Sequence, residues 1–174
     1  GTNYVSVRVY DTAGNSATLV DPFYVRKSAT APTIGDNQNG DDNWRAASGT
    51  TYNVDFYDDA GAGLDTAEYK IWQLPNQGGI AYTDWVPIFS TLNTTYYITN
   101  WNVDASFGSL QQGYNYVTVI SSDLAGNTTS MIDVFHIRKD TQGPGMTNGE
   151  QGGDQTWRSV AKPDGYNVDF DDSG

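Results

Sequence analysis

The chain has 174 residues, no Cys, one His and a formal net charge of −12. Such an acidic surface repels nucleic acid and anionic membranes, and no apolar run approaches the roughly 20 residues that cross a bilayer. We therefore expect neither nucleic-acid binding nor membrane insertion. The lack of Cys excludes a disulfide-stapled scaffold and thiolate metal sites, and an aromatic content of 13% is too high for a disordered chain.

The first predicted element is a hairpin in residues 1–29, and it recurs later in the chain. Three blocks return at a constant offset of 112 residues: GTNYVSV from Gly1 returns as GYNYVTV from Gly113, DTAGN from Asp11 as DLAGN from Asp123, and FYVRK from Phe23 as FHIRK from Phe135. A fixed period of this length indicates a tandem array of like domains. Residues 1–29 therefore match the C-terminal hairpin of a preceding module.

Residues 30–139 span one whole period and predict a complete module. Apolar and polar residues alternate, as in strands with one buried face, and no segment has convincing helical periodicity. The expected strands lie near Pro32–Ile34 and at residues 50–57, 67–72, 81–89, 94–103, 114–120 and 131–137. About seven strands is the number of an immunoglobulin-type sandwich. In that topology the turns at Asp58–Gly63 and Asp123–Asn127 lie together, at the end that meets the preceding module.

Residues 140–174 repeat the start of the module. The pair Trp44-Arg45 returns as Trp157-Arg158, and YNVDF from Tyr52 returns as YNVDF from Tyr166. This segment is predicted to be the N-terminal strands of a following module. Because a two-strand fragment does not bury a core alone, we expect that the chain was cut from a longer polypeptide; completion of each flank by a neighbouring molecule is the alternative.

The order of these motifs resembles the bacterial immunoglobulin-like repeats that are strung along large surface adhesins. The resemblance covers residues 30–139 and both flanks, and its most specific parts are the Asp-x-Ala-Gly-Asn turn and the linker Lys139–Pro144 (KDTQGP). The turn at Gly61–Leu64 departs from the commoner Ser-Gly, and residues 73–112 are longer and more aromatic than the family pattern. The resemblance implies an all-β fold of tandem immunoglobulin-like β-sandwich modules of about seven strands, one complete and two partial.

The function that this resemblance implies is structural rather than catalytic. We expect a repeat of a long bacterial surface protein, extracellular or secreted, that serves as stalk or fibre shaft in adhesion or cell-surface assembly. Its partners would be neighbouring modules of the same polypeptide or fibre. The one His, His136, lies in a predicted strand where the sister repeat has Tyr24, so no nucleophile–base pair can be built around it, and we do not expect an enzyme.

Calcium at a module junction is the one cofactor that the sequence suggests. Hard cations bind clustered carboxylate and amide oxygens in loops, and the candidates here are Asp58, Asp59, Asp123 and Asn127, with Asp140 at the next junction. The segment Asp36–Asp42 (DNQNGDD) is also rich in oxygen ligands, but it lacks the spacing of an EF-hand. The alternative is that these residues only form turns, because Asp and Asn bond their own backbone.

Aromatic residues gather in the long middle stretch and suggest a second function. Trp72, Trp85 and Trp101, with Tyr82, Tyr96 and Tyr97 near them, could stack on sugar rings of host or environmental surface glycans, which would make residues 72–101 a binding patch. Core packing and cross-strand pairing are the alternative, and exposure of the three Trp side chains discriminates between them. A third hypothesis is self-assembly by strand exchange between the incomplete flanks.

Overall fold

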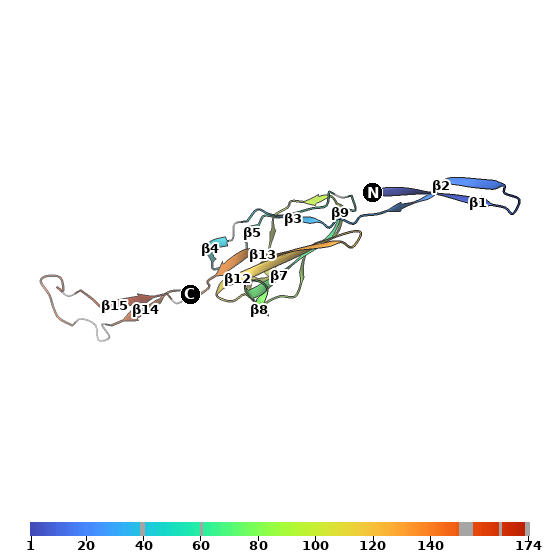
Figure 1. Ribbon diagram of the computed structural model, residues 1–174. Helices are drawn as coiled ribbons and strands as arrows, with labels where there is room; N and C mark the ends of the chain where they lie inside the picture. The colour runs from blue at the N-terminus through green and yellow to red at the C-terminus, as the bar shows by residue number, and fades with distance from the viewer. Residues whose placement is uncertain (39–40, 60, 150–154, 164, 173–174) are drawn as a thin grey trace.

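The computed structural model describes residues 1–38, 41–59, 61–149, 155–163 and 165–172, and in this part of the chain strands dominate. The predicted all-β fold class is confirmed. A central block lies between two hairpins that project from opposite ends (Figure 1). The first hairpin pairs β1 (Thr2–Tyr10) with β2 (Ser16–Arg26), and the last pairs β14 (Gly145–Asn148) with β15 (Val168–Asp171).

The central block has one large sheet and two small ones. The large sheet has the order β4-β13-β12-β7-β8, and β9 also pairs with β7; its strands are β4 (Asp41–Arg45), β7 (Leu64–Leu74), β8 (Gly78–Ala81), β9 (Val86–Thr94), β12 (Gly113–Asp123) and β13 (Thr128–Lys139). All its pairs are antiparallel except β4 with β13, which is parallel.

The small sheets pack against the inner face of the large one. One has the order β10-β6-β3 and the other pairs β11 with β5; the strands are β3 (Thr33–Asp36), β5 (Thr51–Tyr52), β6 (Val54–Tyr57), β10 (Tyr96–Tyr97) and β11 (Trp101–Asn102). Tyr52 stacks on Phe135 of β13 with ring centroids 4.2 Å apart. Side chains from both layers therefore share one apolar core.

Three of the expected strands are interrupted, and the first of them, residues 50–57, divides into β5 and β6, which lie in different small sheets. Residues 81–89 divide into the end of β8 and the start of β9, because in the gap the hydroxyl of Thr83 accepts the hydrogen bond of the Ile71 amide at 3.1 Å and replaces a backbone partner. Residues 94–103 divide into β10 and β11. Trp101 lies on β11 in the core, stacked on Tyr69 at 5.4 Å.

A short helix, α1 (Asp104–Phe107), follows β11 and was not predicted. Its C-terminal end is held by Lys139, whose ammonium donates to the carbonyl oxygens of Phe107 at 3.1 Å, Gly108 at 3.3 Å and Leu110 at 2.9 Å. Lys139 is buried, and a buried ammonium must be satisfied by such acceptors. The lysine therefore connects the end of β13 to α1 and to the residues that follow it.

The end hairpins repeat pairs of strands of the central block. Val5 pairs with Phe23 in β1–β2 as Val117 pairs with Phe135 in β12–β13, and both ladders then shift register at the next residue. Each hairpin also holds one Asp in the left-handed region, Asp21 at φ 51° and Asp133 at φ 52°. In the same way Met146 pairs with Phe170 in β14–β15, and Ile34 pairs with Phe56 in β3–β6.

Candidate functional site

The two acidic turns lie together at the end of the central block that faces β1–β2. The amide of Leu124 donates to the carbonyl of Gly63 at 2.9 Å and joins the turn after β12 to the turn after β6. The linker from β2 reaches the same place, because the hydroxyl of Ser28 donates to Asp123 Oδ2 at 3.3 Å. Farther along, the hydroxyl of Thr129 donates to the carbonyl of Pro32 at 2.6 Å. The end of the block at which a junction was expected therefore holds both turns and the linker.

The carboxylate of Asp123 holds its turn together by accepting four hydrogen bonds. Oδ1 accepts the amides of Ala125 at 3.0 Å and Asn127 at 2.8 Å, and Oδ2 accepts the Asn127 side-chain amide at 2.8 Å as well as the Ser28 hydroxyl. A carboxylate offers about four lone-pair directions, and here all are used. Gly126, at φ 86°, supplies the left-handed residue that the turn needs.

The first hairpin has the same turn. Asp11 accepts the amides of Ala13 at 3.0 Å and Asn15 at 2.8 Å, together with the Asn15 side chain at 2.8 Å. The Asp-x-Ala-Gly-Asn motif is therefore explained by its local chemistry: Asp accepts, Gly takes the positive φ, and Asn clamps the carboxylate. Among the hydrogen bonds of the described residues, the one from the Ser28 hydroxyl distinguishes Asp123 from Asp11, and Asp123 is also buried where Asp11 is exposed.

These contacts lower the pKa of both carboxyl groups. For Asp123, burial raises the pKa, but the hydrogen bonds from the Asn127 side chain, from the amides of Asn127 and Ala125 and from Ser28 together outweigh burial, so the pKa lies below its usual value. For Asp11, the side chain and amide of Asn15 are the main causes of a lowered pKa. Each turn is thus stabilised by the ionised form of its Asp.

The remaining calcium candidates have separate surroundings. Asp58 is buried, and its Oδ2 accepts the amide of Gly63 at 2.7 Å, whereas Asp59 is exposed. Asp140 lies at the opposite end of the block, where its amide donates to the carbonyl of Arg45 and its Oδ1 accepts the amide of Gln142. Of the Asp36–Asp42 segment, residues 39–40 lie outside the described residues. In residues 1–38, 41–59, 61–149, 155–163 and 165–172, no group of three or more His, Cys, Asp or Glu could hold a metal ion. Calcium binding stays a prediction.

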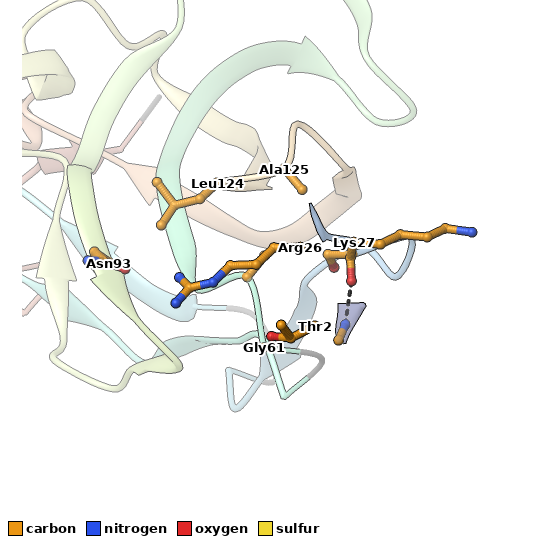
Figure 2. Close-up of a pocket in the computed structure, with 10 residues that line it drawn as sticks. Thr2, Arg26, Lys27, Gly61, Asn93, Leu124 and Ala125 are labelled. Carbon is orange, nitrogen blue, oxygen red and sulfur yellow. Dashed lines mark hydrogen bonds between the residues drawn. The ribbon is translucent and has the colours of Figure 1, made fainter. Parts of the chain in front are cut away.

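A pocket of about 690 Å³ opens beside the acidic turns, between the first hairpin and the central block (Figure 2). Arg26 extends into it toward Asn93 and Leu124, and Lys27 points away. The hairpin is closed there by the N-terminal amino group, which donates to the carbonyl of Lys27. The other lining residues are Gly1, Thr2, Ser28, Gly61, Ala62 and Ala125. This pocket was not predicted, although the repeated Arg-Lys pair at the end of each hairpin marks its edge.

The three candidate tryptophans do not form one patch. Trp101 is buried in the core and is therefore not available to a ligand. Trp72 is half-buried and Trp85 is exposed, and Lys70 lies between them with its ammonium 5.1 Å from the ring centre of Trp72 and 5.9 Å from that of Trp85. Two of the three side chains thus flank a lysine on the outer face of the large sheet.

A second aromatic cluster lies on the same sheet and was missed in the sequence. The guanidinium of Arg138 is 4.2 Å from the ring centre of Trp44 and 5.2 Å from that of Tyr114. His136 lies 5.2 Å from Tyr114 and 3.2 Å from the carboxylate of Asp42. The sequence did contain a signal for this cluster, namely the repeated Trp-Arg and Arg-Lys pairs. They supply Trp44 and Arg138, which the pairing of β4 with β13 places side by side.

Comparison with protein-family models, with curated sequences and with solved structures yields no match. No helix in the described part of the chain has the length and apolar character needed to cross a bilayer.

Proposed function

We propose that this chain is a structural segment of a tandem array of immunoglobulin-like modules, and that the array is the stalk or fibre shaft of an extracellular surface protein. One observation carries the proposal: residues 1–27 and 113–139 have the same strand pairing, the same register shift and the same left-handed Asp, 112 residues apart. Chains that repeat a supersecondary unit at a fixed period form arrays in which each unit contacts its neighbours.

The strand order of the central block supports an immunoglobulin-like module. In such folds the third, sixth and seventh strands form one sheet, and the first, second, fourth and fifth form the other. The neighbours β7, β12 and β13 correspond to the first group, and β3, β6 and β10 to the second. The extracellular location rests on the resemblance to bacterial surface repeats, with which an acidic, Cys-free composition agrees.

The contacts of the linker would fix the orientation of one module relative to the next, as a spacer requires. Ser28 bonds to Asp123, and the carbonyl of Pro32 accepts from Thr129, so the linker is fixed at two points on the central block. Pro also restricts the backbone at this point. An array built on such junctions would be extended rather than collapsed.

Length measurement tests this proposal. We would insert one, two or three further copies of residues 30–141 into the chain and measure the maximum dimension by small-angle X-ray scattering. A twelve-residue strand such as β13 is about 40 Å long, so each copy should add about 40 Å. Limited proteolysis of the unaltered chain should leave residues 30–139 intact. Compact particles, or early cleavage inside the central block, would contradict the proposal.

The flanked lysine supports glycan binding as the second candidate function. Trp72 and Trp85 present ring surface on either side of Lys70, and aromatic rings stack on sugar faces. Titration of the chain with neutral oligosaccharides should then quench Trp fluorescence, and Trp85→Ala should remove that response. An unchanged response in Trp85→Ala would exclude the patch as the site.

A further inference from the structure

Lys70 of β7 lies on the outer face of the large sheet, where its ammonium contacts only aromatic rings. The nitrogen is 5.1 Å from the ring centre of Trp72 and 5.9 Å from that of Trp85. Among the described residues, none forms an ion pair with Lys70 or accepts a hydrogen bond from it. Arg138 and Lys139, by contrast, each donate to backbone carbonyl oxygens. The donors of Lys70 are therefore left to solvent or to a partner from outside the chain.

The strand pairing of β7 determines what surrounds this ammonium. Glu68, Lys70 and Trp72 are half-buried, whereas the residues between them are buried in the core, so these three side chains share the outer face. On one side, Lys70 pairs with Thr118 of β12, which carries no charge. On the other side, Trp85 directly precedes β9, which also pairs with β7. The ammonium is thus held between two rings on a regular sheet rather than on a loop.

Two acidic residues near this surface limit the ligands that it can take. Glu68 lies on the same face two residues before Lys70, and Asp84 is exposed next to Trp85 in the sequence. The chain as a whole carries a net charge of −12, so it repels densely charged polyanions. Salt screens this repulsion beyond about 8 Å at physiological ionic strength. A single carboxylate in direct contact with the ammonium is then attracted.

A sugar ring that carries one carboxylate fits these groups. The flat face of the sugar stacks on the indole of Trp85, which is exposed. The carboxylate of an acidic sugar projects from the edge of the sugar ring, so it reaches the ammonium beside Trp85 while the ring stays stacked. Hydrogen bonds between charged groups are stronger than those between neutral ones. The carboxylate therefore adds affinity that a neutral sugar lacks.

We propose that the surface formed by Trp72, Lys70 and Trp85 binds glycans in which an acidic sugar stands among neutral ones, with the sugar carboxylate on the Lys70 ammonium. This inference rests on glycan binding, the second candidate function, and names its substrate class. Trp85 supplies the stacking surface, Trp72 holds the ammonium from the other side, and Lys70 selects the carboxylate. A neutral glycan binds the same surface more weakly.

A matched pair of ligands tests this proposal. One is a trisaccharide of two glucose residues and one glucuronate, and the other is the methyl ester of that trisaccharide, which lacks the charge. Ligand-observed NMR titration of the full chain should give a dissociation constant about tenfold lower for the acid than for the ester. Equal affinities for the two ligands would overturn the proposal and leave neutral glycan binding in place.

Variants of the full chain assign the preference to one side chain. Lys70→Gln should lower the affinity for the acid to that for the ester and leave the affinity for the ester unchanged, whereas Lys70→Arg keeps the charge and should keep the preference. Lys27→Gln removes the same charge at an exposed site after β2 and is the matched control. Glu68→Gln should strengthen binding of the acid roughly twofold, because a like charge is removed. A preference that survives in Lys70→Gln, or disappears in Lys27→Gln, would contradict the assignment.

Two further outcomes separate this inference from the functions proposed above. If neither ligand binds, glycan binding fails together with the inference, whereas the array proposal stands, because it depends on the length measurement. If a capped peptide with one glutamate binds as tightly as the acidic trisaccharide, the surface recognises charge without a sugar, and the inference is wrong.

Discussion

Asp123→Ala should destabilise the central block by about 2–4 kcal/mol. The substitution removes an acceptor that receives two backbone amides, one side-chain amide and one hydroxyl. Hydrogen bonds to a charged group contribute about 1.5–3 kcal/mol each, and water can replace part of this, since Ala125 is exposed and Asn127 is half-buried. The melting temperature should fall by roughly 8–15 °C. The stability of Asp123→Asn should lie between that of the unaltered chain and that of Asp123→Ala. The Asn side chain keeps one oxygen as an acceptor, but its amide nitrogen would face the amide nitrogen of Asn127.

Urea unfolding followed by the fluorescence of the buried Trp101 measures this effect. Asp11→Ala is the matched control, because Asp11 makes the same turn contacts in the exposed hairpin β1–β2; it should leave the unfolding of the central block unchanged. Equal losses from the two variants would refute the assignment of the stabilisation to the junction.

The pH dependence follows from the lowered pKa of Asp123. A carboxyl whose pKa is lower in the folded state stabilises the fold above its unfolded pKa, about 3.9, and this contribution is lost as the pH falls through the folded pKa. The difference in unfolding free energy between the unaltered chain and Asp123→Ala should therefore be constant from about pH 7 to pH 5 and shrink below pH 4. A difference that does not change with pH would show that the ionised carboxylate is not the stabilising form.

Three further predictions concern the core and the metal hypothesis. Lys139→Met should destabilise the central block by about 1–3 kcal/mol because three carbonyls lose a charged donor, whereas Lys27→Met, at the exposed equivalent, should have almost no effect; urea unfolding compares them. Trp101→Ala should cost about 3–5 kcal/mol as a core deletion, and Trp85→Ala less than about 0.5 kcal/mol; both are measured by urea unfolding followed by circular dichroism, which does not depend on either Trp. If the predicted junction site binds Ca²⁺, millimolar Ca²⁺ should raise the melting temperature by more than about 1 °C and a chelator should reverse the rise; no change would contradict the site, because Asp123 would then keep its present hydrogen bonds.

Local signals explain which parts of the fold could be predicted. The strands that became β12 and β13 alternate with period two and are separated by Asp-Leu-Ala-Gly-Asn, so both the strands and their turn follow from neighbouring residues. β4 was missed because DDNWR has no alternation, and its parallel pairing depends on a strand more than 90 residues away. Helix α1 is too short for any periodicity to reveal it.

The candidate site was harder to predict because sequence does not show which face a side chain takes. Trp101 and Trp85 belong to the same aromatic stretch, yet one is in the core and the other is exposed. Lys139 is buried, although lysine is usually exposed. Its place in the repeated Arg-Lys pair did not reveal this, because Lys27 at the equivalent place is exposed. The convergence of Asp123 with Ser28 is a contact across 95 residues, which spacing along the chain could not predict in detail.

The parallel pairing of β4 with β13 has a mechanical consequence. Both strands run from the end of the block that holds the acidic turns toward the end that holds Lys139. Tension applied through the two linkers would pull β4 backward and β13 forward along their common axis. The hydrogen bonds between them would then be loaded together in shear rather than broken one after another. A short strand that adds little to the core would thus determine how much force the central block withstands before it opens.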